Sequence, residues 1–202
     1  MINLIDNISA YFDDDFINII YKDLKINGAS DEEIEKLLKD KHRDLPMMEI
    51  NTFQLNNYKL GSIGFTSREL ENLKIDFVEE KLLSNDYNGN NPTNKIVYLK
   101  VLFDKGSKKI LGCQIANEKN IEARLNAIKT IMEKGGDLKD LVKYKVNPTD
   151  DEWNPDILNI LALSAISKSE ENSTDVEAND IENLLKNKEF LLDVREEYEY
   201  QD

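Results

Sequence analysis

Cysteine and histidine, two residue types that often carry catalysis or bind metals, are scarce in this chain. There is one cysteine, Cys113, and one histidine, His42. Counting therefore excludes an internal redox cysteine pair, a His/Cys zinc site and any catalytic device with two histidines. Cys113 lies in an apolar stretch, which predicts a small buried residue; a nucleophilic thiol would need an electropositive site, which nothing nearby supplies. His42, between Lys41 and Arg43, is predicted to lie at the surface.

The acidic clusters and the loop aromatics are the other candidates for chemistry. Residues 13–15 and 150–152 lack the donor spacing of a calcium loop, and we expect Asp13-Asp14-Asp15 to be a solvated helix start, not a metal site. Tyr87, in the polar loop SNDYNGNNP, has two interpretations: a hydroxyl that reaches a neighbouring site, or an ordinary loop aromatic. Trp153 is expected to anchor a helix by packing. Neither GxGxxG nor GxxxxGK[ST] occurs, so no phosphate-binding loop is predicted.

Composition narrows the function classes further. The chain has 202 residues, and 26 basic against 40 acidic side chains give a net charge of −14. Binding to nucleic acid or to an anionic membrane is disfavoured, because both require Lys and Arg to meet phosphate. No apolar run is long enough to span a membrane, and the N-terminus does not resemble a secretory signal. The single cysteine suits a reducing cytoplasm, where we expect the protein to be located.

The elements that would position these residues alternate between strand and helix over 49–168. Two strands, 95–103 and 109–116, are joined by a turn at 104–107 in which Gly106 is expected to take a positive φ. Further strands are predicted at 61–65 and 75–83, and helices at 66–73, 121–132, 137–144 and 156–167. The pattern predicts an α+β fold with an antiparallel sheet backed by helices.

Two elements of this region are unusually apolar. Helix 156–167 is apolar nearly all round, with Asn154 as its expected cap and Pro155 at its first position. Strand 95–103 is apolar on both faces. We expect both to need more cover than one small domain gives, and a two-fold partner to supply it through an interface on the order of 2,000 Å² in total.

The flanking segments differ from this region in composition. Residues 1–48 are acidic and helical in pattern, with a capping box that begins at Ser30. Residues 169–176 are polar and indicate a linker. Residues 177–202 predict a helix and then an apolar run, which amounts to a short, incomplete α/β tail.

Two stretches of residues 50–168 resemble a known family. They are INTFQLNNYKLGSIGFTSRELENLKIDFVEE and KIVYLKVLFDKGSKKILGCQIANEKNIEARLNAIKTIMEKGGDLKDL. Together they resemble the C-terminal dimerisation domain of pyridine nucleotide-disulfide oxidoreductases, nearest to the coenzyme A-disulfide reductase and NADH oxidase branch. The resemblance implies an antiparallel sheet backed by helices that builds a two-fold interface. The tail, with Asp193-Val194-Arg195-Glu196, resembles the start of a rhodanese domain, but ends before that domain's persulfide-forming cysteine.

Departures from the family pattern shape the functional expectation. In the family, FAD and NAD(P)H domains precede this region; their motifs are missing here, so no cofactor is expected in this chain. The loop 146–152 resembles one that carries a catalytic histidine, but Asn147 occupies that position, and an amide cannot relay a proton near neutrality. Tyr87 loosely matches a tyrosine that the coenzyme A branch offers to its substrate.

The sequence therefore predicts a dimerisation module that is not catalytic by itself and that forms a homodimer. One alternative is that the chain supplies the dimer half of a split FAD- and NAD(P)H-dependent reductase and pairs with a flavoprotein subunit. Another is a binding module in sulfur trafficking that uses the rhodanese-like tail.

Overall fold

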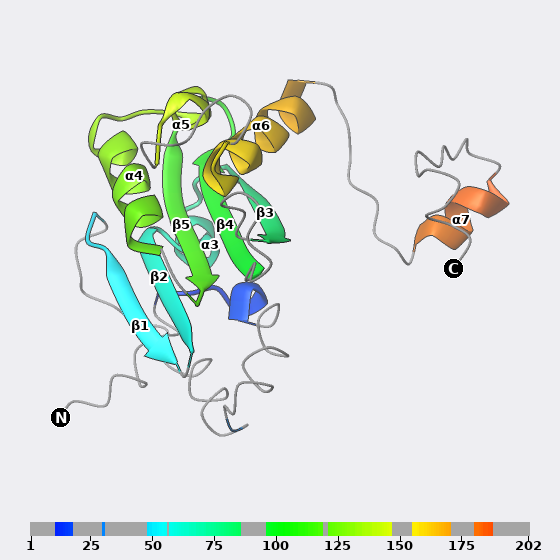
Figure 1. The fold of residues 1–202 in the computed structure, drawn as a ribbon. Helices are drawn as coiled ribbons and strands as arrows, with labels where there is room; N and C mark the ends of the chain where they lie inside the picture. The colour runs from blue at the N-terminus through cyan, green and yellow to red at the C-terminus, as the bar shows by residue number, and fades with distance from the viewer. Residues whose placement is uncertain are drawn as a thin grey trace. The chain divides into compact units, whose positions relative to one another are not determined.

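The computed structural model describes residues 11–17, 30, 48–55, 57–85, 96–118, 121–146, 155–170 and 180–187. The chain divides into two compact units, residues 1–167 and 168–202. The first unit holds the sheet and its covering helices, and Figure 1 shows its arrangement. In the second unit, α7 (Ile181–Lys186) forms where a helix was predicted, and its Ile181 and Leu185 are exposed.

The described residues form a five-stranded antiparallel sheet in the order β1-β2-β5-β4-β3. This arrangement confirms the predicted α+β class with helices against an antiparallel sheet. The central hairpin is the predicted one, because β4 and β5 pair directly along their lengths. The strands are β1 (Asn51–Leu55), β2 (Tyr58–Gly64), β3 (Phe77–Asn85), β4 (Ile96–Asp104) and β5 (Ile110–Asn117).

The main core lies on one side of this sheet, which we call the helix face. Alternate residues of β4 from Val97 to Phe103 point to it, together with Cys113 and Ile115 of β5. Three helices cover it: α4 (Ile121–Glu133), α5 (Leu138–Lys143) and α6 (Ile157–Glu170). Burying each large apolar side chain in such a core contributes about 1.5–3 kcal/mol.

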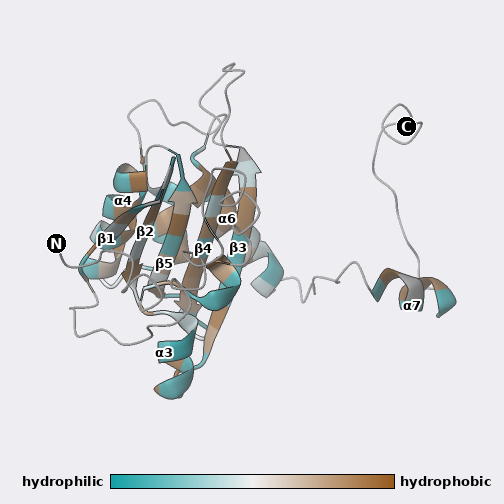
Figure 2. Cartoon of the chain, turned by 90° about the horizontal axis from the view of Figure 1, so that it is seen from below, coloured by the Kyte–Doolittle hydropathy of each residue, from teal (hydrophilic) through white to brown (hydrophobic). Residues whose placement is uncertain are grey.

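The opposite side of the sheet, which we call the second face, is also covered. It carries Tyr98, Lys100 and Leu102 of β4, and all three are buried. The short helix α3 (Ser67–Asn72) lies on the other side of the sheet from α4 (Figure 2). Residues 11–17, which include one helical turn, pack on this face as well. The expectation that strand 95–103 needs a partner's cover is therefore wrong: residues 97–103 are all buried within one chain.

Local signals set most helix ends as predicted. Thr66 and Glu69 form a capping box at α3, and Asp137 and Asp140 form another at α5. Helix α4 ends in a Schellman pattern: the Gly136 N–H donates to the carbonyl of Ile131, five residues earlier, and Gly135 takes a φ of 63°. The turn between β4 and β5 differs from the prediction, since Lys108 takes the positive φ, at 61°, and Gly106 does not.

Candidate interaction surfaces

Helix α6 is held in place through its first turn. The Leu158 N–H donates to the Asp156 carboxylate at 3.0 Å, and the Asp156 N–H donates to Asn159 Oδ1 at 2.9 Å. These reciprocal bonds form an N-cap, so the helix is capped at Asp156, two residues after the predicted Asn154. Asn154 itself lies outside the described residues.

The same first turn ties α6 to the two other helices. Arg124 of α4 donates from Nε to both carboxylate oxygens of Asp156, at 3.1 and 3.0 Å, and from Nη2 at 3.0 Å, and both residues are buried. The Asn159 amide donates to the carbonyls of Leu141 and Tyr144, at the end of α5. A bidentate, buried pair of this kind fixes orientation as well as distance. These bonds therefore fix which side of α6 faces outward.

Only part of α6 is used by the core of its own chain. Leu158, Leu161 and Ala162 are buried against the helix face. On the outer side, Ile160 is 43% exposed and Leu163, one turn further, is 51% exposed. We call these two residues the outer stripe of α6. The prediction that this helix needs a partner to cover it therefore concerns only the outer stripe.

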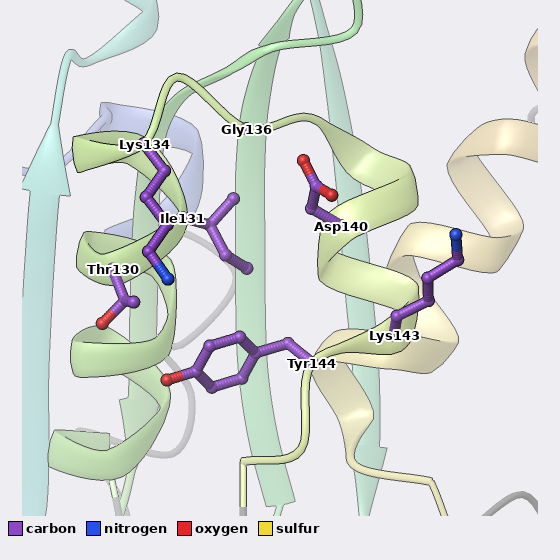
Figure 3. Close-up of a pocket in the computed structure, with 7 residues that line it drawn as sticks. All are labelled: Thr130, Ile131, Lys134, Gly136, Asp140, Lys143 and Tyr144. Atoms are coloured by element: carbon purple, nitrogen blue, oxygen red, sulfur yellow. The ribbon is translucent and has the colours of Figure 1, made fainter.

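A hollow of about 300 Å³ lies between α4 and α5. In Figure 3 the Tyr144 ring extends from the end of α5 toward α4, and the side chains of Lys134 and Asp140 lie on opposite sides of the hollow. The one carboxylate among its lining residues, Asp140, accepts from the Asp137 N–H at 3.1 Å and so takes part in the cap of α5. The residues that line it are Thr130, Ile131, Lys134, Gly136, Asp140, Lys143 and Tyr144.

The second face carries a buried ion cluster that the sequence analysis did not identify. Lys100, 1% exposed, places its Nζ 3.0 Å from Asp13, 2.9 Å from Asp15 and 2.9 Å from Glu79 of β3. Lys81, the next residue of β3 on this face, also pairs with Asp15 and Glu79. The signal that could have revealed the cluster is the lysine itself, in the middle of the apolar strand KIVYLKVLF, since a buried lysine requires partners.

The ion pairs outweigh the effect of burial on these groups. Burial alone would raise the pKa of Asp15 and of Glu79, but hydrogen bonds from Lys81 and Lys100 lower both below their ordinary values. Burial alone would lower the pKa of Lys100, but the attraction of Asp13 and the bonds to Asp15 and Glu79 raise it. These shifts hold Asp15, Glu79 and Lys100 in their charged forms near neutral pH.

Asp13 corrects the prediction of a solvated acidic helix start. The helical turn does begin directly after it, but its side chain is only 6% exposed. Its carboxylate accepts from the Gln114 amide at 2.6 Å and from the Ser67 N–H and hydroxyl at about 3.0 Å, and its own N–H donates to Gln114 Oε1. The residues that the structure describes include no group of three or more His, Cys, Asp or Glu side chains that could hold a metal ion.

The other predicted residues have varied outcomes. Cys113 is buried as expected, and burial raises the pKa of its thiol from 9.0 to about 12. Tyr87, Asn147, His42 and Trp153 lie outside the described residues, so their proposed roles stay predictions. The same holds for the rhodanese-like residues 193–196. Within the described part of the chain, no helix has the length and apolar character needed to cross a membrane.

Comparison with known sequences gives a family match over about half of the chain. Residues 50–152 match the family described as "Pyridine nucleotide-disulphide oxidoreductase, dimerisation domain". The coenzyme A disulfide reductase of Staphylococcus epidermidis is 26% identical over 116 residues, which cover 57% of this chain and 26% of that protein. The chain thus spans about a quarter of the length of this curated relative.

Solved structures share the fold. The reduced CoADR-RHD of Bacillus anthracis has a TM-score of 0.61 at 20% identity, and the match covers 83% of this chain and 31% of that one. A NAD-dependent persulfide reductase from A. fulgidus has a TM-score of 0.58 at 16% identity, with 73% and 28% covered. The water-forming NADH oxidase of Lactobacillus brevis has 0.56 at 17%, with 70% and 32% covered. At these identities the likeness concerns the fold alone.

Proposed function

Since the chain belongs to the pyridine nucleotide-disulphide oxidoreductase family through its dimerisation domain, we propose that it pairs with a second copy of itself and carries out no catalysis alone. The observation that carries this proposal is the outer stripe of α6. One side of α6 completes the core of its own chain. Ile160 and Leu163, on adjacent turns of the opposite side, stay exposed. Apolar side chains that adjoin on a rigid surface are typical of interaction sites.

The geometry around α6 supports a defined interface. The Arg124–Asp156 pair and the Asn159 bonds to α5 set the direction of the helix before any partner arrives. The Ser164 hydroxyl also donates to Glu80 of β3 at 2.8 Å, which ties the middle of α6 to this edge strand. A surface that is fixed in this way loses little conformational entropy on association. Two copies that meet along α6 would each contribute the same residues, as a two-fold interface requires.

A second candidate is an assembly with a separate flavin-carrying polypeptide. This candidate follows from the family match, because the part of each relative that this chain matches is between 26% and 32% of that relative. In this proposal FAD and NAD(P)H are bound by the partner, and the present chain supplies the dimer interface. A yellow flavoprotein that co-purifies with the chain would support it, and a colourless homodimer would support the first proposal. Either assembly would be placed in the cytoplasm, which the single buried Cys113 suits.

The homodimer is tested by sedimentation velocity on the full chain and on two matched variants. Leu163→Asp places a charge in the outer stripe, whereas Leu73→Asp makes the same change at the C-cap residue of α3, a leucine that is 58% exposed against 51% for Leu163. We expect a dimer for the unmodified chain and for Leu73→Asp. For Leu163→Asp we expect at least a ~10-fold weaker association, because a buried leucine contributes about 1.5–3 kcal/mol. Equal association of the two variants would contradict this assignment of the interface.

A further inference from the structure

We propose that the second face of the sheet is a binding site for a short acidic and aromatic peptide segment, and that residues 11–17 (YFDDDFI) are its occupant in this chain. We call these residues the clasp. They lie outside the family match, which begins at residue 50, yet they cover the face that α4, α5 and α6 leave open. The inference is independent of the dimer proposal, since the outer stripe of α6 belongs to the opposite side.

The clasp crosses the sheet from one edge strand to the other. At one end the rings of Tyr11 and Phe12 lie 5.3 and 6.0 Å from the ring of Phe53 on β1. At the other end Asp15 pairs with Lys81 of β3. Between these points Asp13 contacts β5 through Gln114 and β4 through Lys100. One seven-residue segment therefore reaches four strands of the sheet.

Apolar contacts provide the anchors of the clasp. Phe12 and Ile17 are fully buried and Phe16 is 2% exposed. The rings of Phe12 and Phe16 stack with their centroids 5.6 Å apart. Aromatic side chains that are buried to this degree dominate the energy of most peptide interfaces.

Recognition centres on Asp13. Its carboxylate accepts from Lys100, Gln114 and Ser67, and its N–H donates back to Gln114. These donors converge from β4, β5 and the start of α3. An asparagine at position 13 would remove the negative charge beside a lysine that is 1% exposed, and would present an NH₂ group where only acceptors fit. The site therefore selects an aspartate that directly follows an aromatic residue.

Asp14 provides a matched control within the same segment. Its side chain is 48% exposed, and its Oδ1 lies 3.9 Å from Nη1 of Arg68. Replacing Asp14 with asparagine changes the charge of the segment by the same amount as replacing Asp13. Lys100, Gln114 and Ser67 donate to the Asp13 carboxylate, so the two substitutions separate recognition of this aspartate from general charge attraction.

The proposal is tested on the full chain carrying a single protease recognition sequence between residues 31 and 47. We expect the N-terminal fragment to stay bound to the sheet after cleavage and to be displaced by an excess of a synthetic peptide of residues 8–20. The Asp13→Asn peptide should compete at least ~10-fold less well than the unmodified peptide, and the Asp14→Asn peptide about equally well. Size-exclusion chromatography with a fluorescent N-terminal fragment measures all three.

Three results would overturn the proposal. One is a fragment that leaves the sheet as soon as the chain is cut, while circular dichroism stays unchanged. Another is a fragment that no peptide displaces, since the clasp would then be a fixed part of the core. The last is equal competition by the Asp13→Asn and Asp14→Asn peptides, which would show that the face responds to charge and does not recognise one aspartate.

Discussion

The replacement of Lys100 by methionine tests whether the second face is built around a buried charge cluster. Methionine keeps the apolar length of the side chain but removes the ammonium that lies within 3.0 Å of three carboxylates. Removing one partner of a buried pair costs about 3–5 kcal/mol, because the other charge stays buried and uncompensated. Of the three carboxylates only Asp13 is deeply buried, while Asp15 and Glu79 are 40% and 37% exposed. We therefore expect the low end, a loss of about 3 kcal/mol in the free energy of unfolding at pH 7.

Lys81→Met is the control for this substitution. Lys81 pairs with two of the same carboxylates, but its side chain is 36% exposed. Water screens such a pair, and its loss costs about 0–1 kcal/mol. In urea unfolding followed by circular dichroism, with a slope of about 2 kcal/mol per M, Lys100→Met should lower the midpoint by about 1.5 M and Lys81→Met by less than about 0.5 M.

Acidification gives a second test of the same cluster. The pKa values of Asp15 and Glu79 are lowered in the folded protein, so their contribution to stability is present above their ordinary pKa values of 3.8 and 4.5 and is lost as pH falls below them. Protonated carboxyls no longer need a cation, so the stabilities of the unmodified protein and of Lys100→Met should converge as pH falls below about 4.5. The reasoning is refuted if Lys100→Met costs no more than Lys81→Met, or if the difference between the two proteins widens in acid.

Three further experiments test other parts of the fold. Arg124→Ala leaves the buried Asp156 carboxylate without its cation, and should lower the free energy of unfolding by about 3–5 kcal/mol in urea; a loss below about 1 kcal/mol would contradict the role given to this pair. Gly64→Ala, at a φ of 80° and with its new Cβ against the Leu111 carbonyl oxygen, should cost more than about 1 kcal/mol, whereas Gly106→Ala should change stability by less than about 0.5 kcal/mol. Cys113, buried and with the pKa of its thiol raised to about 12, should react with a thiol reagent only after unfolding; rapid labelling of the native protein would show that β5 is open to solvent.

Signals local to the sequence predicted much of the fold. The capping boxes at Thr66 and Asp137 and the glycine stop at Gly135 depend on residues within a few positions of each other, and the helices that they bound formed close to the predicted ranges 66–73, 121–132 and 137–144. The two apolar strands 95–103 and 109–116, with a turn at 104–107 between them, likewise indicated a central hairpin. The shift of the positive φ from Gly106 to Lys108 shows the limit of this approach, because a hairpin's exact register decides which residue carries the strain.

The features missed were those that join distant parts of the chain. Asp13 and Gln114 are 101 residues apart, and Arg124 and Asp156 are 32 apart. Each of these side chains alone has the polarity of a surface residue, and only the fold makes it a buried partner. The same reason explains the error about strand 95–103, because its side on the second face is covered by residues 11–17, which are distant from it in the sequence.

The molar mass of the unmodified chain in solution tests the central claim, association through the dimerisation domain, most directly. Light scattering at micromolar concentration should give twice the chain mass of 23.3 kDa, without flavin absorbance. A mass of one chain over the whole concentration range would contradict the account, because the outer stripe of α6 would then be an ordinary exposed surface.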